Sequence, residues 1–186
     1  MPSRAEGYIL RATAKRSSPS STAFCGRPSQ ICSFLASRLW TSACRRRGPW
    51  VGDFRIVRSY ATHRHVLLAV NGQHENVVIK VQNKRTVTDA TQVECIYKEF
   101  CFLKHTLDHP HIIRCERMLH SRYNVHLVLQ YGGDVCMEQV LSTQLGHRLS
   151  RDDAFKCSAQ VASALSYCHA LDVVHGQVSL RHVTVE

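Results

Sequence analysis

The dipeptide Asn71-Gly72 restricts the fold more than any other feature of this sequence, because it separates two apolar runs at 65–70 and 76–81. Asn-Gly is the pair that type I′ turns favour, since both central residues of such a turn take a positive φ. The pattern predicts a β-hairpin. A third, partly alternating run at 53–60 precedes it, so we expect three strands in an antiparallel meander.

An amphipathic helix is expected next, over residues 92–107. Five apolar residues recur there at three- and four-residue spacing: Val93, Ile96, Phe100, Leu103 and Leu107. Pro110 should end the helix, because proline lacks an amide and disfavours helical geometry in the residue before it. Two further strand-like runs follow at 112–119 and 125–131, before Gly132-Gly133 breaks the chain.

The last third of the chain is predicted to be mainly helical. A short helix is expected over 134–145, and a long one begins at Ser150, where Asp153 completes a near capping box. The apolar stripe of the long helix consists of Ala154, Cys157, Val161, Ala164, Leu165 and Cys168. A strand-like piece at 182–186 ends the sequence. The order of elements predicts an α+β fold.

The amino-terminal tail differs from the rest in charge. Residues 1–48 hold 9 of the 24 Lys and Arg residues and one acid, Glu6, whereas the chain as a whole carries a net charge of +10. A Ser- and Arg-rich segment with almost no acids is typical of a mitochondrial or plastid transit peptide, but it equally fits a disordered basic arm. Nucleic-acid binding would depend on this tail alone, so we expect no nucleic-acid partner.

Cysteine and histidine usage indicates neither disulfides nor a metal. The nine cysteines form no C-x-x-C pair, which favours free thiols in a reducing, intracellular compartment such as the cytoplasm. The densest histidine cluster, His105, His109 and His111, has no Cys or Glu at ligand spacing, so we expect no metal site. The sequence contains no run of 18 apolar residues, so no membrane-spanning helix is predicted.

Four stretches, in order, resemble the protein kinase superfamily. Residues 77–80 (VVIK) resemble its V-A-I-K strand, 98–103 with 108–113 its helix C and exit loop, 127–131 its hinge, and 165–175 the approach to its catalytic loop. Within the superfamily, the sequences of these stretches are most similar to those of Ser/Thr kinases. The resemblance implies a partial domain over 49–186. It would have an amino-terminal lobe at 53–131, with a five-stranded antiparallel sheet and helix C, and the hinge and first helices of the second lobe at 132–186.

The resemblance implies an ATP pocket that would bind ATP only weakly. Its residues would be Lys80, Glu99, Val66, Val78, Gln130 and Gly132, with Leu129 as the gatekeeper. Lys80 and Glu99 would form an ion pair that either grips phosphates or only locks the helix to the sheet, and the second alternative is favoured. The three glycines of the family's lid fall on Ser59, Ala61 and Arg64. Glycine lets backbone amides approach phosphate, so this lid should bind poorly.

The catalytic loop departs from the family at three positions. His175 matches, but Gln177 replaces the aspartate, Ser179 the lysine and His182 the magnesium-binding asparagine. An amide has no useful basicity, and imidazole is a poor ligand for Mg²⁺. No D-F-G follows. We therefore expect no catalytic or metal-binding residue, no required cofactor, and at most weak, Mg²⁺-independent ATP binding.

The sequence thus predicts a truncated pseudokinase that acts as a binding or scaffold module, or is a truncated gene product. One alternative is a fragment of an ATP-binding Ser/Thr kinase whose remaining half is missing from this chain. A second is an organelle-targeted protein that acts through its basic tail. The residues that would cover the helix at 150–170 are missing, so we also expect a protein partner on that helix.

Overall fold

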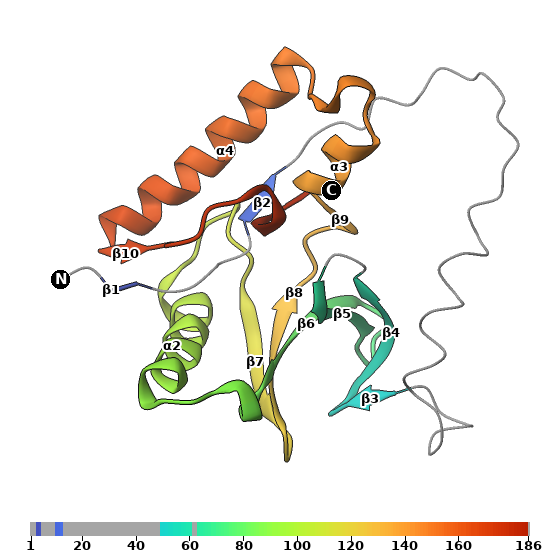
Figure 1. The fold of residues 1–186 in the computed structure, drawn as a ribbon, viewed down its shortest axis with the longest axis vertical. Coiled ribbons are helices and arrows are strands. Elements are labelled where there is room, and N and C mark those ends of the chain that lie inside the picture. The colour runs from blue at the N-terminus through green and yellow to red at the C-terminus, as the bar shows by residue number, and fades with distance from the viewer. Residues whose placement is uncertain (1–2, 5–9, 13–48, 61–62, 186) are drawn as a thin grey trace, which may run out of the picture.

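The computed structural model describes residues 3–4, 10–12, 49–60 and 63–185 (Figure 1). An antiparallel sheet of six strands dominates the amino-terminal half, in the order β3-β4-β5-β6-β8-β7. Its strands are β3 (Trp50–Val51), β4 (Phe54–Tyr60), β5 (His63–Val70), β6 (Asn76–Asn83), β7 (Cys115–His120) and β8 (Asn124–Gln130). The five expected strands are confirmed, and the short β3 extends the sheet at its β4 edge.

The β5–β6 hairpin is present, but the predicted type I′ turn is wrong. Val70 pairs with Asn76, and the Asn71 amide donates to the Glu75 carbonyl, so the connection is longer than two residues. The positive φ belongs to His74, at 63°, and not to Gly72. The Oδ1 of Asn71 accepts from the amides of Gln73 and Glu75, which favours a local turn started by Asn71 over the two-residue alternative.

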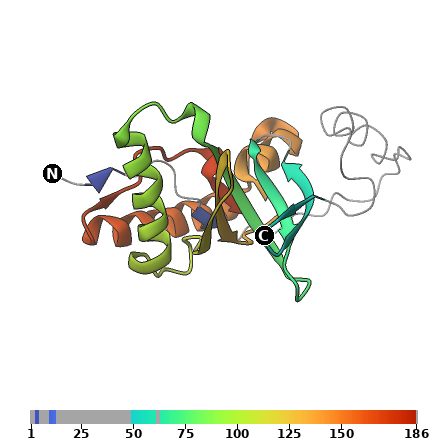
Figure 2. The ribbon, with the colours of Figure 1, turned by 90° about the horizontal axis from the view of Figure 1, so that it is seen from below.

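Helix α2 (Ala90–Cys101) continues as a π-helical segment, Phe102–Thr106. Asp89 caps its first turn by accepting from the Gln92 amide at 2.9 Å. Of the predicted apolar face, Leu103 and Leu107 are buried, whereas Val93 in the first turn is exposed. Figures 1 and 2 both show α2 on the side of β7 and β8, away from β3 and β4.

Strand alternation sorts the sheet into two apolar faces. One face joins the main core, which runs without interruption from Leu68 and Val78 through Leu103 to Cys168 of the last helix. The opposite face forms a smaller cluster of Phe54, Ala69, Val77, Ile79 and Val128. Val78 and Lys80 therefore point to the side where the main core and the second half of the chain lie.

The second half of the fold is the smaller, carboxy-terminal part that follows the sheet, residues 132–185. It contains β9 (Val135–Cys136), α3 (Met137–Thr143), α4 (Arg151–Ala170), β10 (Val173–Val174) and β11 (Val183–Val185). Ser150 caps α4 by accepting from the Asp153 amide at 3.1 Å, as predicted. The loop after α2 fastens the two halves together. The Asp108 amide donates to the Tyr167 hydroxyl at 3.2 Å, and the His109 ring lies 3.2 Å from the Ser163 hydroxyl.

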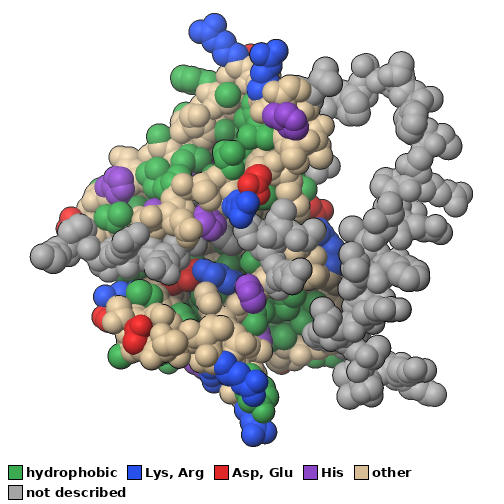
Figure 3. Space-filling view, viewed as in Figure 1, with side chains coloured by type: hydrophobic (Ala, Val, Ile, Leu, Met, Phe, Trp, Pro, Cys, Tyr) green, Lys and Arg blue, Asp and Glu red, His purple; other side chains and the backbone are tan. Residues whose placement is uncertain are grey.

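The expectation that the apolar stripe of α4 is uncovered is wrong. Cys157, Ala164 and Cys168 are buried, and Val161 and Leu165 are half-buried. Part of the cover comes from an unexpected source, since the amino-terminal strand β2 (Leu10–Ala12) packs against α4. Hydrophobic side chains still gather on the surface over α4 (Figure 3), and Phe155 of this helix is 76% exposed.

Two short strands lie within residues 1–48, the tail predicted to be a disordered arm or a transit peptide. Strand β1 (Ser3–Arg4) pairs in parallel with β10, and β2 pairs in parallel with β11. The rest of the tail lies outside the described residues. Within the described ranges, no helix is long and apolar enough to cross a membrane. Six cysteines lie in those ranges, and all are free thiols.

Candidate nucleotide-binding site

Lys80 and Glu99 form the expected ion pair. The Lys80 Nζ lies 2.7 and 2.9 Å from the two carboxylate oxygens of Glu99. Strand β6 presents Lys80 on the same face as Val78, and α2 presents Glu99 toward the sheet near the end of the helix. Both the ammonium and the carboxylate are largely removed from solvent, at 20% and 6% exposure. The pair links α2 to the centre of the sheet.

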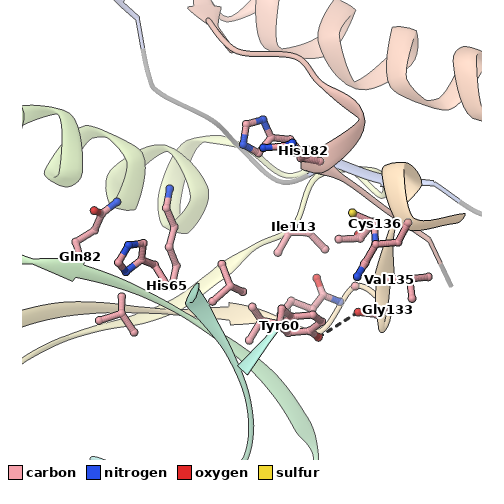
Figure 4. A pocket seen from close by; sticks show the side chains of 17 residues that line it. Tyr60, His65, Gln82, Ile113, Gly133, Val135, Cys136 and His182 are labelled. Carbon is pink, nitrogen blue, oxygen red and sulfur yellow. Dashed lines mark hydrogen bonds between the residues drawn. The ribbon is translucent and has the colours of Figure 1, made fainter. Parts of the chain in front are cut away.

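A cavity of about 250 Å³ lies beside this pair, between the sheet and the second half of the chain (Figure 4). Five of the six predicted pocket residues line it: Val66, Val78, Lys80, Gln130 and Gly132. Glu99 does not line the cavity and reaches it only through Lys80. The cavity is also lined by His182, which the sequence placed in the catalytic loop, whereas sequence reasoning missed several lining residues, among them Tyr60, His65, Ile113, Arg181 and Thr184.

The hinge runs from β8 to β9 and forms one wall of the cavity. A Cβ on Gly132 would collide with the Ile113 side chain and lie 2.8 Å from the Thr184 hydroxyl, so glycine allows the backbone to approach both residues closely. Gly133 takes a φ of 113°, which other residues rarely adopt. Ile113 precedes β7 and Thr184 lies in β11, so the hinge is in contact with segments from both halves of the chain.

The lid between β4 and β5 is short. Tyr60, the last residue of β4, pairs with His63, the first residue of β5, and residues 61 and 62 lie outside the described part. The Tyr60 side chain is buried, and its hydroxyl donates to the Gly133 carbonyl at 3.3 Å (Figure 4). Arg58 adds an ion pair to Asp134 at 2.6 Å. The lid strand is therefore tied to the hinge by the chain's own side chains.

Two tyrosines of this region are hard to ionise. Burial raises the pKa of Tyr60, and the nearby Asp134 adds to that effect. Burial, with a hydrogen bond to Asp134, raises the pKa of Tyr131 to about 12. Both phenols therefore remain neutral donors at any physiological pH.

The loop after β10 holds the residues that replace the family's catalytic groups. His175 is buried, and its Nδ1 accepts from the Gln177 amide at 3.2 Å. The Nδ1 of His182 lies 2.8 Å from the Gln177 carbonyl and 3.1 Å from the Ser179 hydroxyl. Because a carbonyl only accepts, this nitrogen carries the proton in that contact. His182 lies across the cavity from His65 and Gln82 (Figure 4).

The cavity wall is basic. Its ionisable nitrogen groups are Lys80, Arg181, His65 and His182, and no aspartate or glutamate is among the described lining residues. Arg181 is bound by both carboxylate oxygens of Glu138, at 3.0 and 2.9 Å, which holds its guanidinium at the rim. Both of its permanent cations already hold a carboxylate, Lys80 that of Glu99 and Arg181 that of Glu138, and the described wall offers no carboxylate of its own to Mg²⁺, a cation that prefers oxygen ligands.

Across the residues that the structure describes, no three His, Cys, Asp or Glu side chains come together as a metal site. Of the histidine cluster, His109 stacks on Tyr167, with ring centroids 5.3 Å apart, and bonds Ser163. Its role is contact between the α2 exit loop and α4. Burial and the neighbouring His111 lower the pKa of His109.

Comparison with known proteins agrees with this geometry. A family model described as the protein kinase domain matches residues 62–178, more than half of the chain. CBL-interacting protein kinase 31 of Oryza sativa subsp. japonica is 29% identical over 73% of this chain and 30% of its own length. Serine/threonine-protein kinase SIK2 of Gallus gallus is 30% identical over 73% of this chain and 15% of its own.

A fungal relative is more distant. The carbon catabolite-derepressing protein kinase of Candida glabrata is 26% identical over 69% of this chain and 21% of its own length. The chain thus spans less than a third of each of these relatives. The matched region contains strands β5, β6, β7 and β8, the Lys80–Glu99 pair, the hinge and the start of the loop after β10, up to Val178. This chain belongs to the protein kinase family.

Proposed function

We propose that this chain is a nucleotide-binding, non-catalytic member of its family, a module that binds through a kinase-like pocket without transferring phosphate. The observation that carries the proposal is the chemistry of the cavity. Lys80 remains in place to meet a phosphate, but among the described lining residues no carboxylate is present to serve either as the family's general base or as a ligand for Mg²⁺. Phosphoryl transfer depends on both of these groups.

The contacts of Gln177 support the absence of catalysis. Its backbone amide and carbonyl are engaged by His175 and His182, so the loop is held in one arrangement. The side chain in that position is an amide, which cannot accept the proton of a substrate hydroxyl. Ser179, in contact with His182, brings no positive charge to a transferred phosphate.

The basic wall supports weak binding that is independent of Mg²⁺. Lys80 is already neutralised by Glu99, so a nucleotide phosphate would gain less from it than from a free ammonium. At the end of the lid that contacts the hinge, a nucleotide would meet the ring of Tyr60 and not backbone amides. Affinity would then come mainly from apolar contacts with Val66, Val78 and Ile113.

Binding is tested by titrating the purified full chain with ATP in EDTA and again in excess Mg²⁺, with calorimetry as the readout. We expect the two dissociation constants to agree within about threefold, because no second group holds the metal. A dissociation constant that tightens by about a hundredfold or more only with Mg²⁺ contradicts the proposal.

Catalysis is tested separately with ATP and generic Ser/Thr peptide substrates. We expect no phosphopeptide from the native chain and none from Gln177→Asp, because Ser179 and His182 still lack the charge and oxygen ligands that transfer needs. A variant that removes both members of the ion pair, Lys80→Met/Glu99→Leu, controls for a contaminating kinase. Phosphorylation by the native chain that this double variant abolishes would contradict the proposal.

A second candidate is an amino-terminal fragment of an ATP-binding Ser/Thr kinase. It is favoured by the intact Lys80–Glu99 pair and by the small share of each relative that the chain covers. The sequence of the messenger RNA around the codon for Glu186 separates the two. An in-frame D-F-G and A-P-E further on favours the second candidate, and a stop codon there favours the first.

A further inference from the structure

Strand β11 places two valines in the core and so requires partners on both of its edges. Val183 and Val185 are 6% and 4% exposed. Backbone groups at this depth need hydrogen-bond partners, because a buried amide or carbonyl without one costs about 1–3 kcal/mol. On one edge, β9 pairs with Thr184 and Val185. On the other edge lies β2, which pairs Leu10 with Val183 and Ala12 with Val185.

The amino-terminal segment follows the carboxy-terminal one at two separate points. Ser3 and Arg4 pair with Val173 and Val174, and farther along both segments β2 pairs with β11. Both pairings are parallel, so the two segments run in the same direction. A parallel strand of two or three residues is weak by itself. Because the two pairings occur in the same order along both segments, each pairing keeps the segments aligned for the other.

Strand β2 also touches two parts of the molecule that matter for the cavity. It packs against α4 (Figure 1), which carries the buried Ala164 and Cys168. It pairs Arg11 with Thr184, and Thr184 lines the cavity and lies close to Gly132 of the hinge. The amino-terminal strand is thus the direct neighbour of the strand that forms the cavity wall opposite the sheet.

From these contacts we infer that β1 and β2 are a built-in edge of the fold, in which Ser3–Arg4 and Leu10–Ala12 act within the same chain to order 173–185 and so keep the cavity wall in place. This role is separate from nucleotide binding and needs no ligand. It also gives the start of the basic tail a structural function that is lost when that segment is removed. Removal of residues 1–48, as from a transit peptide, would take the edge away.

The test is hydrogen exchange of the full chain carrying Leu10→Pro/Arg11→Pro. Successive amides in a strand point to opposite sides, so two adjacent prolines necessarily remove an amide that faces β11. We expect the segment 173–185 to exchange about tenfold faster or more than in the native chain, while β7 and β8 are unchanged. The matched control is Ser20→Pro/Ser21→Pro, which places the same two prolines in the part of the tail outside the described residues.

Addition in trans gives a second, independent measurement. A synthetic peptide of residues 1–14 should restore slow exchange at 173–185 in the Leu10→Pro/Arg11→Pro chain, and the same peptide with both prolines should not. The inference is overturned if the double-proline chain is as protected there as the Ser20→Pro/Ser21→Pro control. It is equally overturned if the native peptide and the proline peptide act alike.

Discussion

The ammonium of Lys80 lies within 2.9 Å of both carboxylate oxygens of Glu99, although the two residues are 19 positions apart in the chain. Glu99 is the more deeply buried of the two. A buried carboxylate that loses its counter-charge is far less stable than one that keeps it. The pair therefore fastens α2 to the sheet whether or not a nucleotide occupies the cavity.

Replacing Lys80 alone should destabilise the protein strongly. We expect Lys80→Met to lower the free energy of unfolding by about 3 kcal/mol, because the buried carboxylate of Glu99 loses the ammonium that balances its charge. The double variant Lys80→Met/Glu99→Leu should recover most of this loss, since both charges are then gone. Urea unfolding monitored by circular dichroism measures each value.

The matched control for this pair is Lys98→Met on the same helix. Lys98 bonds Glu94 at 2.9 Å, but both side chains are exposed. Exposed pairs contribute about 0–1 kcal/mol, so this change should be small. Equal losses for Lys80→Met and Lys98→Met would show that burial of Glu99 does not determine the stability of the pair.

The hinge should not tolerate a side chain at Gly132. We expect Gly132→Ala to lower the free energy of unfolding by about 2 kcal/mol, because the new Cβ overpacks against Ile113 and Thr184. Gly72→Ala is the control, since nothing lies within 4 Å of a Cβ there. Ile113→Val removes the nearest methyl group, so it should relieve part of the Gly132→Ala effect in the double variant. Strictly additive losses in thermal unfolding would contradict this contact.

Local patterns allowed much of the fold to be predicted. Alternation in 76–81 separates Val77 and Ile79 from Val78 and Lys80, and the structure keeps that separation on the two faces of the sheet. The spacing of Leu103 and Leu107 likewise marks the buried side of the helical segment. In each case a few neighbouring residues determine the face, so the signal lies within the element itself.

Features that depend on distant segments were missed. Strands β1 and β2 are too short to show a period, and their partners lie at the other end of the chain. The contact of Tyr60 with Gly133 depends on how the β4–β5 hairpin curls over the hinge, and nothing near Tyr60 in the sequence indicates it. The burial of the α4 stripe could not be foreseen for the same reason, because β2 supplies part of its cover.

Thiol reactivity should differ sharply between Cys115 in the core and Cys101 on the surface of α2. Burial, with the nearby Glu99, raises the pKa of the Cys115 thiol to about 12, whereas Cys101 is exposed on α2. Because the thiolate is the reactive form, Cys115 should alkylate about a hundredfold or more slowly than Cys101 in iodoacetamide at pH 8. Peptide mass spectrometry measures both rates, and in urea they should become similar. Comparable rates in the native protein would contradict the burial of Cys115.

Alkaline pH should destabilise the protein through the hinge tyrosines. The pKa of Tyr131 is raised from 10.0 to about 12 in the folded protein, chiefly by burial. The unfolded chain therefore releases this proton first, and the stability that Tyr131 contributes is fully present below pH 10 and is lost as the pH rises from 10 to 12. Tyr60, whose pKa is also raised, adds to the loss in the same direction.

The contribution of Tyr131 can be isolated by comparing phenylalanine variants. Tyr131→Phe removes the ionisable group, so the free energy of unfolding should fall less steeply with pH between about 10 and 12 than in the native chain. Tyr123→Phe serves as the control, because Tyr123 is exposed at the β7–β8 turn. Urea titrations at a series of alkaline pH values give the slopes. If Tyr131→Phe keeps the native slope and Tyr123→Phe reduces it, then the alkaline sensitivity arises outside the hinge.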